Sequence, residues 1–173
     1  ALIEKFVTTV DNLPRSRVAE RVRPMKSLPN TFVAEPGATD DSYVLGSDNY
    51  ARYEALVNML INADTTTLVN TYRRYYPLMQ ESYVNLGYPD GYFNDRVIEV
   101  IDHLLATPDV ADRPKLTRPH VLYEYEDAAL ESLSSGQKLL IRMGKQNATA
   151  VQRALRAVRE QLIATADTDS DSD

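Results

Sequence analysis

Apolar residues recur at intervals of three and four along most of this chain, which is the pattern of amphipathic helices. Stretches with this spacing cover residues 1–13, 47–62, 64–87, 92–106, 127–143 and 147–166. Pro14 ends the first stretch, because a residue before proline disfavours helical geometry. Pro77 interrupts the third, so we expect a kink or break there. The pattern predicts a mainly α, single-domain bundle of about five to six helices.

Two short regions depart from the helical pattern. Thr31–Glu35 and Ser42–Leu45 are β-prone runs around a turn, which predicts a small β-hairpin within residues 30–46. In the second half of the chain, His120–Tyr125 is the best strand candidate, giving short strands in the 120–125 region. Residues 14–46 are rich in proline and lack sustained periodicity, and we expect an extended arm laid over the helical body.

The C-terminal tail differs from the rest of the chain in composition. Residues 167–173 read DTDSDSD, with no apolar side chain to bury, so we expect them to be disordered. Residues 1–166 are assigned to one helical domain. The chain has 19 Lys and Arg against 25 Asp and Glu, a formal net charge of −6, and much of that excess lies in the tail. A nearly neutral body lacks the basic field of nucleic-acid-binding proteins, and we expect no nucleic-acid partner.

Several classes of chemistry are excluded or left open by simple counts. The chain has no cysteine, which excludes disulfides, thiol catalysis and cysteine-based zinc sites. No apolar run approaches the ~18 residues of a membrane span. Ala1 is not an initiator methionine and helical spacing begins at Leu2, so we expect a chain trimmed from a longer one. We expect no cofactor.

Acidic and imidazole side chains repeat at four-residue intervals on the polar face of the helix predicted around residues 94–105. Asp95, Glu99 and His103 could present two carboxylates and an imidazole to one metal ion, or act as acid, base and orienting group. The alternative is a solvated ladder of charge pairs, a routine feature of helix surfaces, and we favour it. We therefore predict no metal site and keep a metal-dependent hydrolase as an alternative function.

Tyrosine dominates the aromatic residues, with eleven Tyr against three Phe and no Trp. Most fall within residues 50–92, where amphipathic rings would suit a groove for a peptide or glycan strand. A half-buried core is the other interpretation. The predicted binding surface comprises Arg73, Arg74, Tyr76, Tyr88, Tyr92, Asn94, Asp95 and Arg96. Residues 94–96 stand at a helix start, where capping and a buried salt bridge would explain them without a ligand.

Several unusual strings resemble a single protein family. They are FVTTVDNLP at 6–14, NYARY at 49–53, YRRYYP at 72–77, GYPDGYFNDRVIEVIDHLLATP at 87–108 and SGQKLLIRMG at 135–144. Together they resemble the bacterial domain-of-unknown-function family 3014 (DUF3014) over roughly residues 1–165. The resemblance implies a Gram-negative protein with one N-terminal membrane helix, a linker and this domain on the periplasmic face of the inner membrane. It implies no activity, cofactor or ligand. The family's motif residues, which carry no assigned role, fall on Tyr92, Asn94, Asp95, Arg96, Asp102 and His103.

These observations favour a non-enzymatic binding or adaptor domain of a membrane-tethered bacterial envelope protein. Its expected partner is a protein or a peptidoglycan-like strand, and contact with the membrane is expected only through an anchor preceding Ala1. The alternatives are the metal-dependent hydrolase and a purely structural domain that self-associates through the apolar stripe Val151–Leu162. The oligomeric state stays open.

Overall fold

The computed structural model describes residues 2–16 and 31–170, and for residues 165–170 the backbone alone. The helices within these ranges are α1 (Leu2–Asn12), α2 (Asp48–Asn62), α3 (Thr65–Asn85), α4 (Phe93–Leu105), α5 (Ala128–Glu131), α6 (Ser135–Arg142) and α7 (Lys145–Ser170). The strands are β1 (Ala34–Pro36), β2 (Tyr43–Leu45), β3 (Lys115–Thr117) and β4 (Glu124–Tyr125). The predicted mainly α fold with short strands is confirmed, with seven helices in the described part of the chain.

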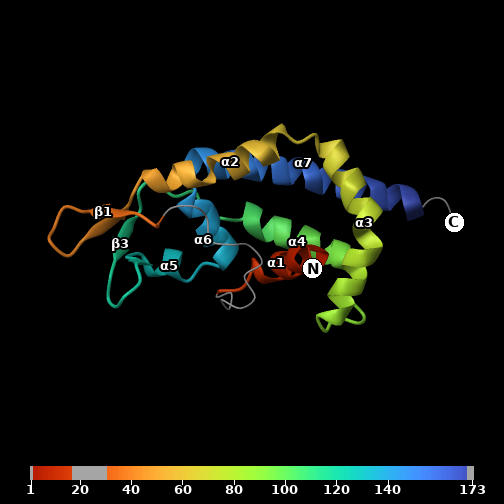
Figure 1. The fold of residues 1–173 in the computed structure, drawn as a ribbon, viewed down its shortest axis with the longest axis horizontal. Coiled ribbons are helices and arrows are strands. Elements are labelled where there is room, and N and C mark those ends of the chain that lie inside the picture. Colours follow the sequence, from red (N-terminus) through yellow and green to blue (C-terminus); the bar gives the residue numbers. More distant parts are fainter. Residues whose placement is uncertain (1, 17–30, 171–173) are drawn as a thin grey trace.

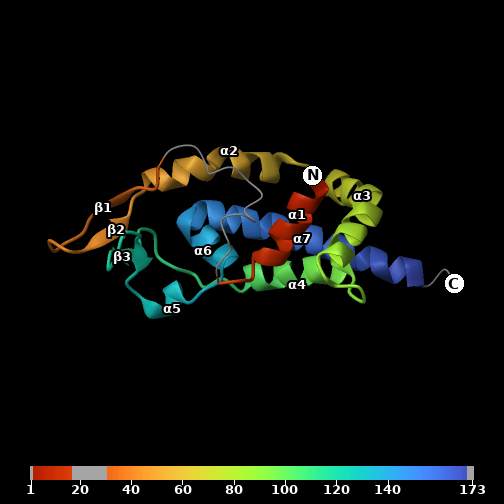
Figure 2. The same cartoon turned by 60° about the horizontal axis from the view of Figure 1, so that its bottom comes forward.

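The molecule is elongated, with the small sheet at one end and α3 at the other (Figure 1). Helix α7 runs along its length and contacts α2, α3, α4 and α6. Turning the molecule shows α7 between α2 and α4 (Figure 2). Helix α1 contacts α3 and α4, and Figure 1 shows it on the opposite side of α4 from α2. This arrangement places α1, α3 and α4 together, and they form the surroundings of the predicted binding residues.

The apolar stripe of α7 lies inside the molecule. Val151 and Leu155 pack against a cluster that includes Val57 of α2 and Leu104 of α4. Farther along the helix, Leu162 is buried against Val69 and Ile101, with Val158 beside them. The stripe Val151–Leu162 therefore packs against neighbouring helices of the same chain, which argues against the alternative of self-association through it.

The four strands form one antiparallel sheet in the order β1-β2-β3-β4. The hairpin predicted in the 30–46 region is confirmed, and Pro36 lies on the edge strand, where its missing N–H is tolerated. The short strand predicted in the 120–125 region is confirmed as β4, which pairs with β3, although it covers only Glu124–Tyr125 of the candidate run His120–Tyr125. Residues 118–123 instead make the hairpin loop, where Val121 and Leu122 are 78% and 76% exposed. Part of the predicted arm, residues 17–30, lies outside the described residues.

Two of the predicted helix boundaries need correction. Helix α3 continues through Pro77 without a break. Pro77 is exposed, so water can reach the carbonyl of Arg73 that loses its helical partner. Helix α7 extends to Ser170, four residues into the segment predicted to be a disordered tail, and residues 171–173 lie outside the described range. Gly87 and Gly144 follow the ends of α3 and α6 with φ angles of 109° and 83°, the left-handed geometry that ends a helix.

The string around Ser134 begins α6 and joins it to α1. Ser134 and Gln137 form a reciprocal capping box. The backbone N–H of Gly136 donates to the Leu13 carbonyl at 2.8 Å. A Cβ at position 136 would lie 2.7 Å from Leu104 Cδ2 and 3.0 Å from the Leu13 oxygen, so this close approach requires glycine.

Candidate binding site

A buried carboxylate joins α1 to α4. Asp11 is 3% exposed and accepts a hydrogen bond from Arg96 Nε at 3.1 Å. Arg96 Nη2 donates to the Asp11 backbone carbonyl at 2.9 Å, so one guanidinium binds both the side chain and the backbone of Asp11 at the end of α1. Arg15 Nη2 donates to the other carboxylate oxygen at 2.7 Å. The buried salt bridge expected for Arg96 is therefore present, and its partner lies on α1.

Two further side chains complete this group, here named the Asp11 cluster (Asp11, Arg15, Tyr88, Arg96 and Glu99). The Tyr88 hydroxyl receives a hydrogen bond from Arg15 at 3.1 Å and lies 3.4 Å from Asp11 Oδ2. Glu99 pairs with Arg96 at 2.9 Å. Burial opposes the charge on Arg96, but Glu99 and Asp11 outweigh it and raise the pKa of the guanidinium. The polar groups of Tyr88 and Arg96 are therefore bonded to other residues of the same chain.

A glutamine of α3 caps the start of α4. Tyr92 occupies the N-cap position without a side-chain cap. Gln80 Oε1 instead accepts from the Phe93 N–H at 2.8 Å, and Gln80 Nε2 donates to the Gly91 carbonyl at 2.7 Å. The Tyr76 hydroxyl donates to the same Gln80 oxygen at 3.0 Å. Tyr76 and Gln80 thus hold the 88–93 turn against α3.

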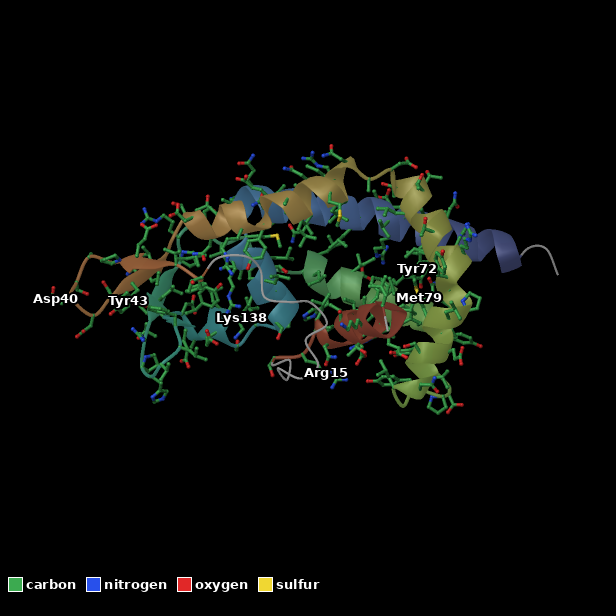
Figure 3. All side chains as sticks on the ribbon, viewed as in Figure 1. Arg15, Asp40, Tyr43, Tyr72, Met79 and Lys138 are labelled. Carbon is green, nitrogen blue, oxygen red and sulfur yellow. The ribbon has the colours of Figure 1, made fainter. Side chains whose placement is uncertain are left out.

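The tyrosines of α3 that face α1 and α4 belong to the core. Phe93 is fully buried among Tyr72, Tyr83 and Val7. Figure 3 shows Tyr72 on this side of α3. Its hydroxyl donates to Asn94 Oδ1 at 3.3 Å, and burial raises its pKa. The half-buried core, which was the alternative interpretation of the tyrosine pattern, describes these residues.

The other half of the predicted binding surface is exposed. Arg73, Arg74, Tyr92 and Asp95 are all exposed, and Tyr92 reaches 67%. Successive residues of a helix point about 100° apart, so Arg73 and Arg74 do not share a face. The Arg74 guanidinium lies 5.9 Å from the centre of the Tyr75 ring. The structure thus places Tyr88 and Arg96 in the Asp11 cluster and leaves four of the eight predicted residues exposed.

The possible metal-binding face of α4 is divided. Glu99 is paired with Arg96, whereas His103 Nε2 lies 2.8 Å from Ser134 Oγ at the start of α6. Asp95 is exposed. Across residues 2–16 and 31–170, no three His, Cys, Asp or Glu side chains are arranged to hold a metal ion.

An open groove runs along the side of α3 next to the start of α1. It encloses about 500 Å³. We name it the α1/α3 groove, and it is lined by Ile3, Glu4, Leu78, Glu81, Ser82, Asn85 and Leu86. Leu78 is 50% exposed and Leu86 is 42% exposed, although both are large apolar side chains. This groove was not predicted from the sequence. Its signal was the spacing of 78, 82 and 86 by four, on a helix face other than the tyrosine stripe.

Fold and site together define a mainly helical domain with an apolar groove open between two helices. The chain belongs to the family described as Protein of unknown function (DUF3014), whose model matches residues 2–159 and confirms the resemblance noted in the sequence. No curated protein and no solved structure is significantly similar to it. Within the described residues, none of the helices combines the length and apolarity needed to cross a membrane.

Proposed function

We propose that this chain is a non-enzymatic binding or adaptor domain that captures a protein segment in the α1/α3 groove. One observation carries the proposal: large apolar side chains of two neighbouring helices line an open groove. Covering Leu78 and Leu86 with a partner would stabilise the complex by about 1 kcal/mol for each side chain. Apolar surface gathered in this way is typical of sites where proteins meet partners.

The lining chemistry favours a protein over a glycan strand. The apolar lining residues are Ile3, Leu78 and Leu86, all aliphatic. Sugar rings stack on aromatic faces, whereas aliphatic side chains pack against other aliphatic side chains. A peptidoglycan-like partner becomes the outcome to consider if no protein is found.

We also propose that the domain faces the bacterial periplasm and is tethered to the inner membrane by an N-terminal helix. Resemblance to DUF3014 proteins supports this part. Protease treatment of spheroplasts carrying the full-length protein tests it. Digestion of the domain in intact spheroplasts is the expected result, and protection until lysis would contradict it.

The binding role is tested by crosslinking the full-length protein in its own host, followed by capture and mass spectrometry. The test variant is Leu78→Asp, which places a charge in the groove. The matched control is Leu122→Asp, which changes an exposed leucine on the β3–β4 loop. We expect one protein partner with the wild type and the control, and its loss with Leu78→Asp. The same partners in all three proteins would contradict the proposal.

A further inference from the structure

The α1/α3 groove has a charge as well as an apolar floor. Its two charged lining residues, Glu4 and Glu81, are both acidic. Ser82 and Asn85 supply the remaining polar groups. We propose, resting on the function proposed above, that the occupant of the groove is a basic amphipathic helix. Its apolar face would lie on Leu78 and Leu86, and its Lys or Arg side chains would meet the carboxylates.

The shape of the groove favours a helix over an extended segment. From Leu78 to Leu86 the lining follows α3 for about 12 Å, which is slightly more than two helical turns. A third helix laid beside α1 and α3 would place side chains at positions i, i+3 or i+4, and i+7 along this length. An extended segment binds through backbone hydrogen bonds to a free strand edge. The walls here are helices, and no strand edge lines the groove among its described residues.

The carboxylates give the groove selectivity more than affinity. Glu81 is exposed, and within the described residues no ion pair is found for it. Ion pairs at such exposed sites contribute about 0.2–1 kcal/mol each and weaken with salt. The two carboxylates disfavour an acidic partner, however, because such a partner would place its own acidic groups against Glu81 and Glu4.

A second groove in the same molecule provides an internal reference. It lies between α2, α3 and α7, encloses about 300 Å³, and has apolar walls that include Leu60, Ile61 and Val158. Arg153 is the single charged residue among its described lining residues. The two grooves therefore offer similar apolar surfaces with opposite charge. A basic helix that binds one groove more tightly than the other must therefore respond to the difference in charge.

The proposal is tested with two blocked, fluorescent peptides of about four helical turns (~15 residues). Both carry the same leucines at i, i+3, i+4 and i+7, and their polar faces carry either lysine or glutamate. Fluorescence anisotropy measures binding to the wild type and to three variants. Leu78→Asp removes the apolar floor and Glu81→Lys reverses the groove charge. Glu54→Lys makes the same charge change at an exposed position of α2 and serves as the matched control.

We expect the lysine peptide to bind the wild type and Glu54→Lys at least tenfold more tightly than the glutamate peptide. Leu78→Asp should abolish this binding, and Glu81→Lys should remove the preference for lysine. Equal binding of both peptides, or an equal effect of Glu54→Lys and Glu81→Lys, would overturn the basic-helix proposal. Those results leave the proposed function intact if host capture still depends on Leu78. Loss of that dependence contradicts the proposed function whatever the peptides do.

Discussion

Helix α1 takes part in two contrasting regions, the Asp11 cluster near its end and the α1/α3 groove near its start. In the cluster, a buried carboxylate and an arginine meet partners within the chain. In the groove, Leu78 of α3 and Leu86 just after α3 remain about half exposed. The residues that stand out in the sequence, Tyr88 and Arg96, thus hold the fold together. Ordinary aliphatic residues form the open surface. Rare residues are a better guide to structural constraint here than to a binding site.

The largest expected effect separates the cluster from the groove. Asp11→Ala should lower the free energy of unfolding by about 3 kcal/mol, because Arg96 would lose its buried partner. Arg15→Ala should cost less than 1 kcal/mol, since that side chain is half exposed. Urea unfolding of both variants measures the difference. Equal, small effects would show that the cluster does not hold α1 to α4.

Tyrosine ionisation sharpens the same contrast between interior and surface. Burial raises the pKa of Tyr125 to about 12. The unfolded chain ionises near pH 10, so this contribution to stability is fully present below pH 10 and is lost between pH 10 and 12. The loss should approach about 2 kcal/mol. The absorbance of tyrosinate follows the ionisation in this chain, which has no tryptophan. Unfolding midpoints at the same pH values measure the loss of stability. A Tyr125→Phe variant should lose part of this pH dependence, because other buried tyrosines such as Tyr72 also have raised pKa values. An unchanged pH dependence would assign the effect elsewhere.

The cap supplied by Gln80 should have an intermediate effect. Gln80→Ala leaves the Phe93 N–H and the Gly91 carbonyl without partners and should cost about 1.5 kcal/mol. Gln80→Glu keeps the acceptor but loses the donor, so its cost should be smaller. Thermal unfolding of the two variants tests this order. An unchanged thermal unfolding midpoint for Gln80→Ala would mean that water replaces the cap.

The groove should show the smallest effect on stability. Leu86→Asp should change the free energy of unfolding by less than about 0.5 kcal/mol, because the side chain already contacts solvent. The same variant should lose the host partner. A large loss of stability would show that Leu86, like Asp11, stabilises the fold.

The local features of the fold were accessible from the sequence, and the contacts between distant segments were not. The helical spacing and the hairpin within residues 30–46 depend on nearby residues, and both were predicted. The hydrogen bond from Arg96 to Asp11 joins positions 85 residues apart. Gln80 caps a helix that begins thirteen residues later on the chain. Neither pair has a local pattern, so Arg96 was placed in the predicted binding surface, with a buried salt bridge to an unnamed partner as the alternative.

Strand β3 and the groove were missed for a related reason. Lys115–Thr117 is only three residues long and follows Pro114, so it looks like a loop until β2 pairs with it. Leu78 and Leu86 were not assigned to any surface, because the tyrosine stripe accounted for the buried face of α3. The position of α1 makes their face a groove, and the packing of α1 on α3 is a tertiary contact.

Photo-crosslinking in the host tests the central claim most directly. In the full-length protein, a photoreactive residue replaces either Leu78 in the groove or Tyr92 at the turn. Both side chains are exposed in the structure. The account predicts a strong crosslink to one protein from position 78 and little or none from position 92. A partner that crosslinks from position 92 and not from position 78 would contradict it, and would return the binding site to the tyrosine-rich turn.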